Sequence, residues 1–239
     1  MNEQFSRVFG DLFAIYSAQL AMSKIGAAAI LTEAEERRLG WAGKTNDFTL
    51  LIGDLAVLFE CKTSALFLSA KKHASLEEVR QDLKKNLVNP KAKKGLFQLQ
   101  EKISAIKSKK LPEELNRRYE QVKKFYPVIL LYDQIQFANK PEALRNVLDA
   151  ELRACGIADF RFQVWHVEEL ENLLELVAAG DLARVIAKKF EGEKAIQWDL
   201  NTLLYEETGK KHRYLCPFMF IPKGDTSALR ILESLSDSQ

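Results

Sequence analysis

TNDFTLLIGDLAVLFECKTS, residues 45–64, is the stretch that decides the fold. Two apolar runs, 48–52 and 55–59, flank the dipeptide Gly53-Asp54. Two strand-like runs separated by a two-residue turn that contains glycine predict a β-hairpin. Gly-Asp suits a turn with a positive φ at its first central position. Both runs are almost continuously apolar, so we expect helices to cover the hairpin on both faces.

The register of this hairpin brings three polar side chains to its open end. Pairing starts with Ile52 opposite Leu55, and each step back on one strand matches a step forward on the other, so Asp47 is expected opposite Glu60. Directly opposed residues share a face of the sheet. Lys62 lies two residues beyond Glu60, and strand alternation places it on that face as well. Two carboxylates and an amine are therefore expected to converge.

Such a trio suits the hydrolysis of a phosphodiester. Neighbouring carboxylates repel each other and are costly to bury unless a cation lies between them. Mg²⁺ typically takes one or two carboxylates together with water and substrate phosphate. The ion lowers the pKa of its bound water and neutralises charge that develops on the phosphate. A lysine at this position orients or deprotonates the water, or holds the phosphate as a point charge.

The pattern D-x12-E-x-K, with TNDF opening the hairpin and LFECK closing it, resembles the PD-(D/E)XK nuclease superfamily. That superfamily includes restriction endonucleases, Holliday-junction resolvases and related defence and repair nucleases. The resemblance implies an α/β, restriction-endonuclease-like fold, in which a mixed central sheet is flanked by helices. It also implies Mg²⁺ or Mn²⁺ ligation by Asp47, Glu60 and the backbone carbonyl of Cys61, with Lys62 as the catalytic lysine.

The helix expected before the hairpin departs from the superfamily pattern at one position. GDLFAIY (10–16) is similar to the G-x-x-F-E-x-Y segment with which members commonly begin, but Ala14 replaces the acid. Asp11 and Glu33 are the candidates to substitute for it. Glu33 resembles a glutamate that close relatives carry just before the hairpin, and we include it in the predicted catalytic set.

A glutamine on the helix after the E-x-K strand is a further feature of many members. GLFQLQEKI (95–103) resembles that segment, and Gln98, which precedes Leu99, matches better than Gln100. Gln98 is therefore the glutamine that we assign to the predicted catalytic set.

Other readings of these residues compete with the catalytic one. D-x5-E-x-K from Asp54 is also a tempting spacing, but six residues at about 3.3 Å each place Asp54 roughly 20 Å from Glu60. Glu60 and Lys62 alone would make an ordinary ion pair at a polar hairpin end. The Cys61 side chain points to the opposite face and is expected to be a core side chain. Trp41 is expected to seal the hairpin and not to stack on a base.

The remaining chain alternates strands with helices, which indicates an α/β fold. We expect a nuclease-like domain over 1–190 and a small C-terminal appendage over 191–239. The expected helices cover 4–24, a segment that ends at Asn89-Pro90, 95–106, 112–124, 141–154, 168–178 and 181–190; the expected strands outside the hairpin cover 27–31, 126–133, 160–167 and 213–222.

The charge distribution along the chain is uneven. The 239 residues carry a net charge of +2, but Lys71 to Lys124 holds 16 Lys or Arg against 7 Asp or Glu, which is +9 and leaves −7 for the rest. A basic block in an otherwise acidic protein is either a nucleic-acid footprint or the solvated face of helices. The predicted phosphate contacts are made by lysines close to the trio or in the loop before Gln98: Lys44, Lys91, Lys93 and Lys94.

Composition narrows the setting and the class of protein. No apolar run approaches the roughly 20 residues of a membrane span, and the first residues do not resemble a signal peptide. Three scattered cysteines make neither a disulfide framework nor a zinc cluster, and a cytoplasmic location is expected. The sequence thus predicts a metal-dependent DNA nuclease, with RNA not excluded as the substrate. We expect a homodimer or a larger defence or repair assembly; the alternative is an inactive nucleic-acid-binding module of such an assembly.

Overall fold

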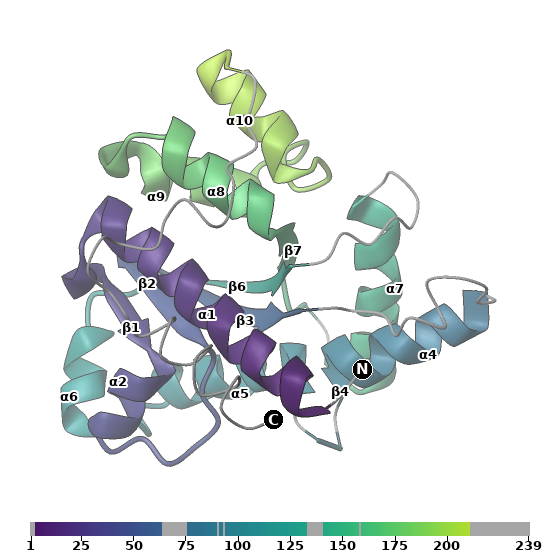
Figure 1. The fold of residues 1–239 in the computed structure, drawn as a ribbon, viewed down its shortest axis with the longest axis horizontal. Helices are drawn as coiled ribbons and strands as arrows, with labels where there is room; N and C mark the ends of the chain where they lie inside the picture. Colours follow the sequence, from purple (N-terminus) through teal and green to yellow (C-terminus); the bar gives the residue numbers. More distant parts are fainter. Residues whose placement is uncertain are drawn as a thin grey trace, which may run out of the picture.

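A five-stranded mixed sheet forms the centre of the computed structural model, which describes residues 3–63, 76–89, 91–92, 94–132, 141–157 and 159–210 (Figure 1). Its strand order is β1-β2-β3-β6-β7, with the first three strands antiparallel and the last three parallel. The α/β class and the mixed central sheet are therefore confirmed. The strands are β1 (Ile30–Thr32), β2 (Phe48–Ile52), β3 (Leu55–Lys62), β6 (Lys124–Leu131) and β7 (Gln163–His166).

Helices cover both faces of the sheet, as the apolar hairpin predicts (Figure 1). Val57 and Phe59 of β3 enter one core and Ala56 and Leu58 enter the other. The first face is covered by α1 (Glu3–Ile25), α8 (Val167–Leu176), α9 (Leu182–Glu191) and α10 (Leu200–Thr208). The second is covered by α4 (Leu76–Leu87), α5 (Leu96–Lys107), α6 (Glu113–Arg118) and α7 (Pro141–Ala154). Alternation along β3 thus sends Glu60 and Lys62 to the α5 face.

The hairpin has the predicted register. Ile52 pairs with Leu55 and Phe48 with Phe59. Gly53 has φ +61, in the region that favours glycine, as the turn requires. β3 continues to Lys62 beyond its last pairing with β2 and is held there by β6, where Ile129 pairs with Glu60. The polar end of β3 therefore projects past β2.

Two expected elements differ from the structure. The helix predicted over 112–124 ends at Arg118, because the backbone N–H groups of Lys123 and Lys124 donate to the Asp54 carbonyl at 2.7 and 3.1 Å. These bonds draw the chain to the hairpin turn, and β6 begins at Lys124. The strand expected over 27–31 is a 3₁₀ turn over Ala27–Ala29, and β1 begins at Ile30.

The loop expected before Gln98 contains a small β-ribbon of β4 (Val88–Asn89) and β5 (Lys94–Gly95). α2 (Glu33–Arg38) follows β1 directly, and Thr32 caps it with a reciprocal bond to Glu35. In the chain, α2 precedes Asp47 and the β-ribbon precedes Gln98, so the two elements help to place these residues.

The described part of the predicted appendage packs on the main core. Leu200, Leu203 and Leu204 of α10 are buried in the same cluster as α8 and α9. The division at residue 190 stays a prediction, and the strand predicted over 213–222 lies outside the described residues. No helix in the described ranges combines the length and apolar character that crossing a membrane would require.

Candidate functional site

Asp47 immediately precedes β2 and leaves the regular ladder. Its N–H donates to the Phe59 carbonyl at 3.0 Å, and its own carbonyl accepts from the Glu33 N–H at 3.0 Å. The carboxylate Oδ2 accepts from the Cys61 N–H at 2.6 Å. Asp47 is thus held against β3 at residues 59–61, with its carboxylate at the projecting end of the strand.

Glu60 is held from two sides, and its side chain is only 5% exposed. Lys62 Nζ donates to Oε1 at 2.6 Å, and Gln98 Nε2 donates to Oε2 at 2.8 Å. Gln98 also donates to the Thr45 carbonyl. Asp47, Glu60, Lys62 and Gln98, predicted from sequence separations of up to 51 residues, are therefore gathered around one hairpin end.

Gly95 fixes the start of the helix that carries Gln98. It is the N-cap of α5 and has φ +63. A Cβ at this position would lie 2.2 Å from the Leu87 carbonyl oxygen, so the close passage of α4 and α5 requires glycine. Gln98 consequently projects from the first turn of α5 toward Glu60.

Burial raises the pKa of both acids, Asp47 and Glu60. Burial raises the pKa of Glu60 to about 7; Lys62 opposes this, and the Asp47 and Glu33 charges add to it. Burial likewise raises the pKa of Asp47, opposed by the Cys61 N–H and Lys62, with Glu33 and Asp11 adding to the rise. Two acids that resist ionisation beside a single amine form a site that gains from additional positive charge.

Lys62 remains a cation. Its burial lowers the pKa, but the charge and hydrogen bond of Glu60 and the charge of Asp47 outweigh this, so the pKa is raised overall. The Lys62 side chain is 23% exposed, more than the Glu60 side chain that it contacts. Lys62 is therefore a charged donor at the mouth of the site.

Two further acids influence the trio from a distance. The Glu33 carboxylate is turned toward Arg37, 3.2 Å away, and is about half exposed. Glu33 nevertheless contributes to the pKa of Asp47 and of Glu60, and Asp11 on α1 contributes to that of Asp47. The structure thus places both proposed substitutes for the acid missing at Ala14 near the trio, and the hydrogen bond between Glu33 and Asp47 joins their backbones.

The Cys61 thiol faces the α1 core, as predicted. Burial raises its pKa well above the ordinary value, and the Asp47 and Glu60 charges add to this. Its backbone supplies the contact to Asp47. Trp41 packs against the α5-side core, and its indole N–H donates to the Lys44 carbonyl at 2.9 Å.

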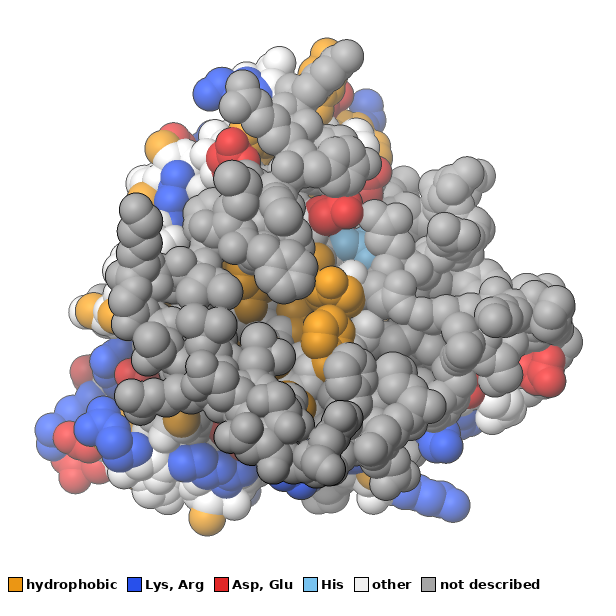
Figure 2. Space-filling model, viewed as in Figure 1, with side chains coloured by type: hydrophobic (Ala, Val, Ile, Leu, Met, Phe, Trp, Pro, Cys, Tyr) orange, Lys and Arg blue, Asp and Glu red, His pale blue; other side chains and the backbone are white. Residues whose placement is uncertain are grey.

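The structure describes three of the four lysines that are predicted to contact phosphate. Lys44, Lys91 and Lys94 are exposed, with Lys94 in β5, whereas Lys93 lies outside the described residues. Figure 2 shows Lys and Arg side chains along the lower edge of the molecule, on the side where Figure 1 places α2 and α6. Cationic side chains therefore gather on that edge of the displayed face.

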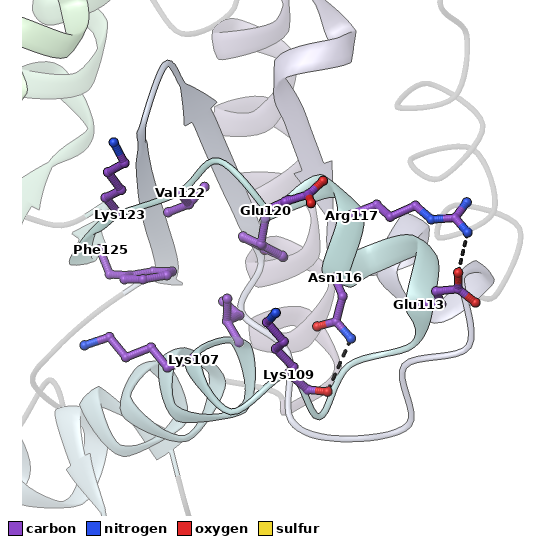
Figure 3. Close-up of a pocket in the computed structure, with 11 residues that line it drawn as sticks. Lys107, Lys109, Glu113, Asn116, Arg117, Glu120, Val122, Lys123 and Phe125 are labelled. Atoms are coloured by element: carbon purple, nitrogen blue, oxygen red, sulfur yellow. Dashed lines mark hydrogen bonds and ion pairs between the residues drawn. The ribbon is translucent and has the colours of Figure 1, made fainter.

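A separate pocket lies toward the other end of the sheet. It has a volume of about 480 Å³ and lies between the end of α5, α6 and the start of β6, with Phe125 and Lys107 on its wall (Figure 3). Phe125 pairs with Ala56, four residues before Glu60, a separation of roughly 13 Å along the strand. The trio does not line this pocket. Its charged walls carry both signs, including the Arg117–Glu113 pair.

Sequence reasoning did not find three contributors: the Thr45 carbonyl, the buried Asn46 and the buried Lys102–Glu36 pair. A signal existed only for Lys102, which falls on the apolar stripe of α5 between Leu99 and Ile106. Within the described ranges, no group of three or more His, Cys, Asp or Glu side chains is placed so that it could hold a metal ion. Searches of protein-family models and of curated proteins find no match for this chain.

Proposed function

We propose that the chain is a metal-dependent nuclease that hydrolyses DNA phosphodiester bonds. One observation carries the proposal: Asp47, Glu60 and Lys62 meet at the projecting end of β3, with Gln98 bonded to Glu60. An ordinary surface ion pair needs neither a second, half-buried acid nor a half-buried amide donor. The arrangement supplies two acids for a cation and one cation for a phosphate.

The two carboxylates fit Mg²⁺ or Mn²⁺. Hard cations prefer oxygen ligands, and Mg²⁺ takes one or two carboxylates and completes its shell with water and substrate oxygens. The raised pKa values of both acids mean that a divalent ion offsets an existing electrostatic cost. When bound, the ion supplies a water of lowered pKa and neutralises charge on the phosphate. The Cys61 carbonyl is proposed as a third ligand.

Each remaining side chain has a separate task. Lys62 stays protonated, so we assign it to orienting the attacking water and holding the phosphate, not to removing the proton. Gln98 fixes the Glu60 carboxylate by bridging it to the Thr45 carbonyl. Glu33 adds negative potential near both acids.

The topology supports a restriction-endonuclease-like fold as the finer assignment. An antiparallel hairpin continues into parallel strands, and its polar end extends past β2. We further propose a role in defence, restriction or repair, in the cytoplasm, with DNA as the partner and Lys44, Lys91, Lys93 and Lys94 contacting the backbone.

The test is cleavage of supercoiled, linear and single-stranded DNA, and of RNA, with Mg²⁺ or Mn²⁺ against EDTA. Cleavage is expected with either ion, is expected to vanish in EDTA, and is expected to fall strongly in Asp47→Ala and in Lys62→Ala. Equal cleavage by these variants would contradict the site. Salt-sensitive binding without cleavage would instead identify an inactive binding module, and selective cleavage of RNA would change the substrate.

A further inference from the structure

A lysine and a glutamate lie completely inside the α5-side core. The side chains of Lys102 on α5 and Glu36 on α2 are 0% and 1% exposed, and Nζ lies 2.7 Å from Oε2. Burial lowers the pKa of Lys102 and raises that of Glu36. Because desolvation of two charges commonly offsets their attraction, such a pair is poor support for stability. Its value must be sought elsewhere.

The pair is the centre of a polar cluster. Tyr119 donates from its hydroxyl to Glu36 Oε1 at 3.1 Å and lies 3.4 Å from Thr49 Oγ1. Thr49 accepts from Asn46 Nδ2 at 3.0 Å. Lys102 Nζ also lies 5.0 Å from the centre of the Trp41 ring. The cluster therefore connects α5 to Glu36 and to Asn46, which lie at the two ends of the segment 36–46 that precedes Asp47.

Helix α5 contacts the segment 36–46 from two successive turns. Gln98 and Lys102 are four residues apart and so share a face of the helix. Gln98 reaches the Thr45 carbonyl and Glu60, and Lys102 reaches Glu36, whose backbone carbonyl accepts from the Trp41 N–H. Any slide or rotation of α5 that kept one contact would break the other.

We propose that the Lys102–Glu36 pair positions α5 so that the Gln98 amide is held between Thr45 and Glu60. The catalytic consequence rests on the proposed function, but the position of Gln98 does not. An apolar substitute for the pair would fill the same space without fixing the height or rotation of α5, because hydrophobic contacts are not directional. Lys102 and Glu36 are accordingly positioning residues.

A triple variant, Glu36→Leu, Lys102→Met and Tyr119→Phe, tests this because it removes the charged pair together with the hydroxyl that donates to Glu36. The matched control is Lys189→Met with Gln163→Leu. It removes another buried lysine, on α9, and the side chain 2.7 Å from it. Thermal unfolding, hydrogen exchange of the Gln98 side-chain amide by NMR, and kcat and KM with Mn²⁺ are measured for each protein.

The triple variant is expected to unfold within a few degrees of the wild type, since apolar replacement of a buried pair is often neutral. Its Gln98 amide is expected to exchange about tenfold faster, and its kcat to fall about 10- to 100-fold, as for groups that orient ligands indirectly. KM should change less than twofold. In the control, kcat and Gln98 exchange should stay at wild-type values.

Gln98 exchange and kcat both within twofold of the wild type would overturn the proposal. If the wild type cleaves nothing, the proposed function fails, and Gln98 exchange alone then decides the positioning. If the triple variant does not fold, Glu36→Gln takes its place, because it keeps the volume and removes one charge. Faster Gln98 exchange in this variant supports the proposal, and wild-type exchange refutes it.

Discussion

Two Lys–Glu pairs in this molecule have nearly the same length and opposite surroundings. Lys62 and Glu60 are 2.6 Å apart at the projecting end of β3, and Lys102 and Glu36 are 2.7 Å apart in the α5-side core. The first pair has a further acid, Asp47, close enough to raise the pKa of Glu60. The second is enclosed by Trp41 and Tyr119.

We propose that charge balance and access separate a reactive pair from a positioning pair. The β3 pair together with Asp47 has two acids for one amine, and its lysine is partly exposed. We propose that the excess acid attracts a cation and that the exposed side admits both the cation and a phosphate. The core pair is balanced and closed. Interaction distance alone does not distinguish them.

Among the substitutions that test the difference between the two pairs, Glu60→Gln is expected to have the largest effect. Because metal-ion catalysis supplies several kcal/mol of transition-state stabilisation, kcat is expected to fall about 10³-fold. Removing a buried charge should at the same time stabilise the metal-free protein. Cleavage rates and urea unfolding measure the two effects. Asp54→Asn, in the exposed turn of the same hairpin, should leave both unchanged; an equal loss there would contradict the site.

Lys62→Met separates the two roles of the lysine. We expect kcat to fall about 10²-fold, at the lower end for removing one charged or hydrogen-bonding catalytic group. Mn²⁺ affinity, measured by calorimetry, should stay equal or rise, because the ammonium no longer occupies Glu60 Oε1. A loss of Mn²⁺ affinity together with kcat would show that Lys62 instead organises the acids.

The pH dependence of stability gives a smaller effect with a defined sign. The pKa of Glu60 is about 7 in the folded protein and near 4.5 when unfolded, so the folded state binds more protons between these values. The contribution of Glu60 to the free energy of unfolding is therefore fully present below pH 4.5. It is lost as the pH rises to about 7, and the loss is about 3 kcal/mol.

Burial also raises the pKa of Glu169 to about 7. We expect Mg²⁺ to distinguish Glu60 from Glu169. Urea unfolding at pH 5 and pH 7.5 is expected to show that Mg²⁺ restores stability at the higher pH in the wild type and in Glu169→Gln. Glu60→Gln should respond to Mg²⁺ much less. Equal responses in all three proteins would place the ion elsewhere.

The smallest expected effect comes from Lys44→Ala. Lys44 is exposed, and we propose that it contacts backbone phosphate. Its loss should weaken DNA binding a few-fold without changing kcat and reduce the slope of log affinity against log salt by about 1. Fluorescence anisotropy over a salt series measures this, with the exposed Lys188 on α9 changed to Ala as the control. An unchanged slope would remove Lys44 from the interface.

The sequence predicted the elements whose pattern is local. The turn at Gly53 and the apolar runs beside it were enough to predict the register, and the register was enough to place Glu60 and Lys62. The preference for Gln98 over Gln100 agrees with the bond to Glu60. These features depend on strand alternation and turn geometry, which short stretches of sequence carry.

The contacts made across the fold were not predictable in this way. The Asp47 N–H donates to the Phe59 carbonyl, one residue out of the hairpin register, and strand pairing within the hairpin gives no sign of this. The Lys102–Glu36 contact joins residues 66 positions apart. α6 ended earlier than its composition suggested, because the Asp54 carbonyl captures the chain at Lys123.

Strand β3 serves two purposes on alternate residues, and this restricts how the gene can change. Odd-numbered positions from Val57 to Cys61 supply the α1-side core, and Glu60 and Lys62 supply the polar group on the other side. A one-residue insertion or deletion within the strand would exchange the two sets and bury both charges under α1. Point substitutions can tune this segment, but length changes must be confined to the turn or to the loops beyond it.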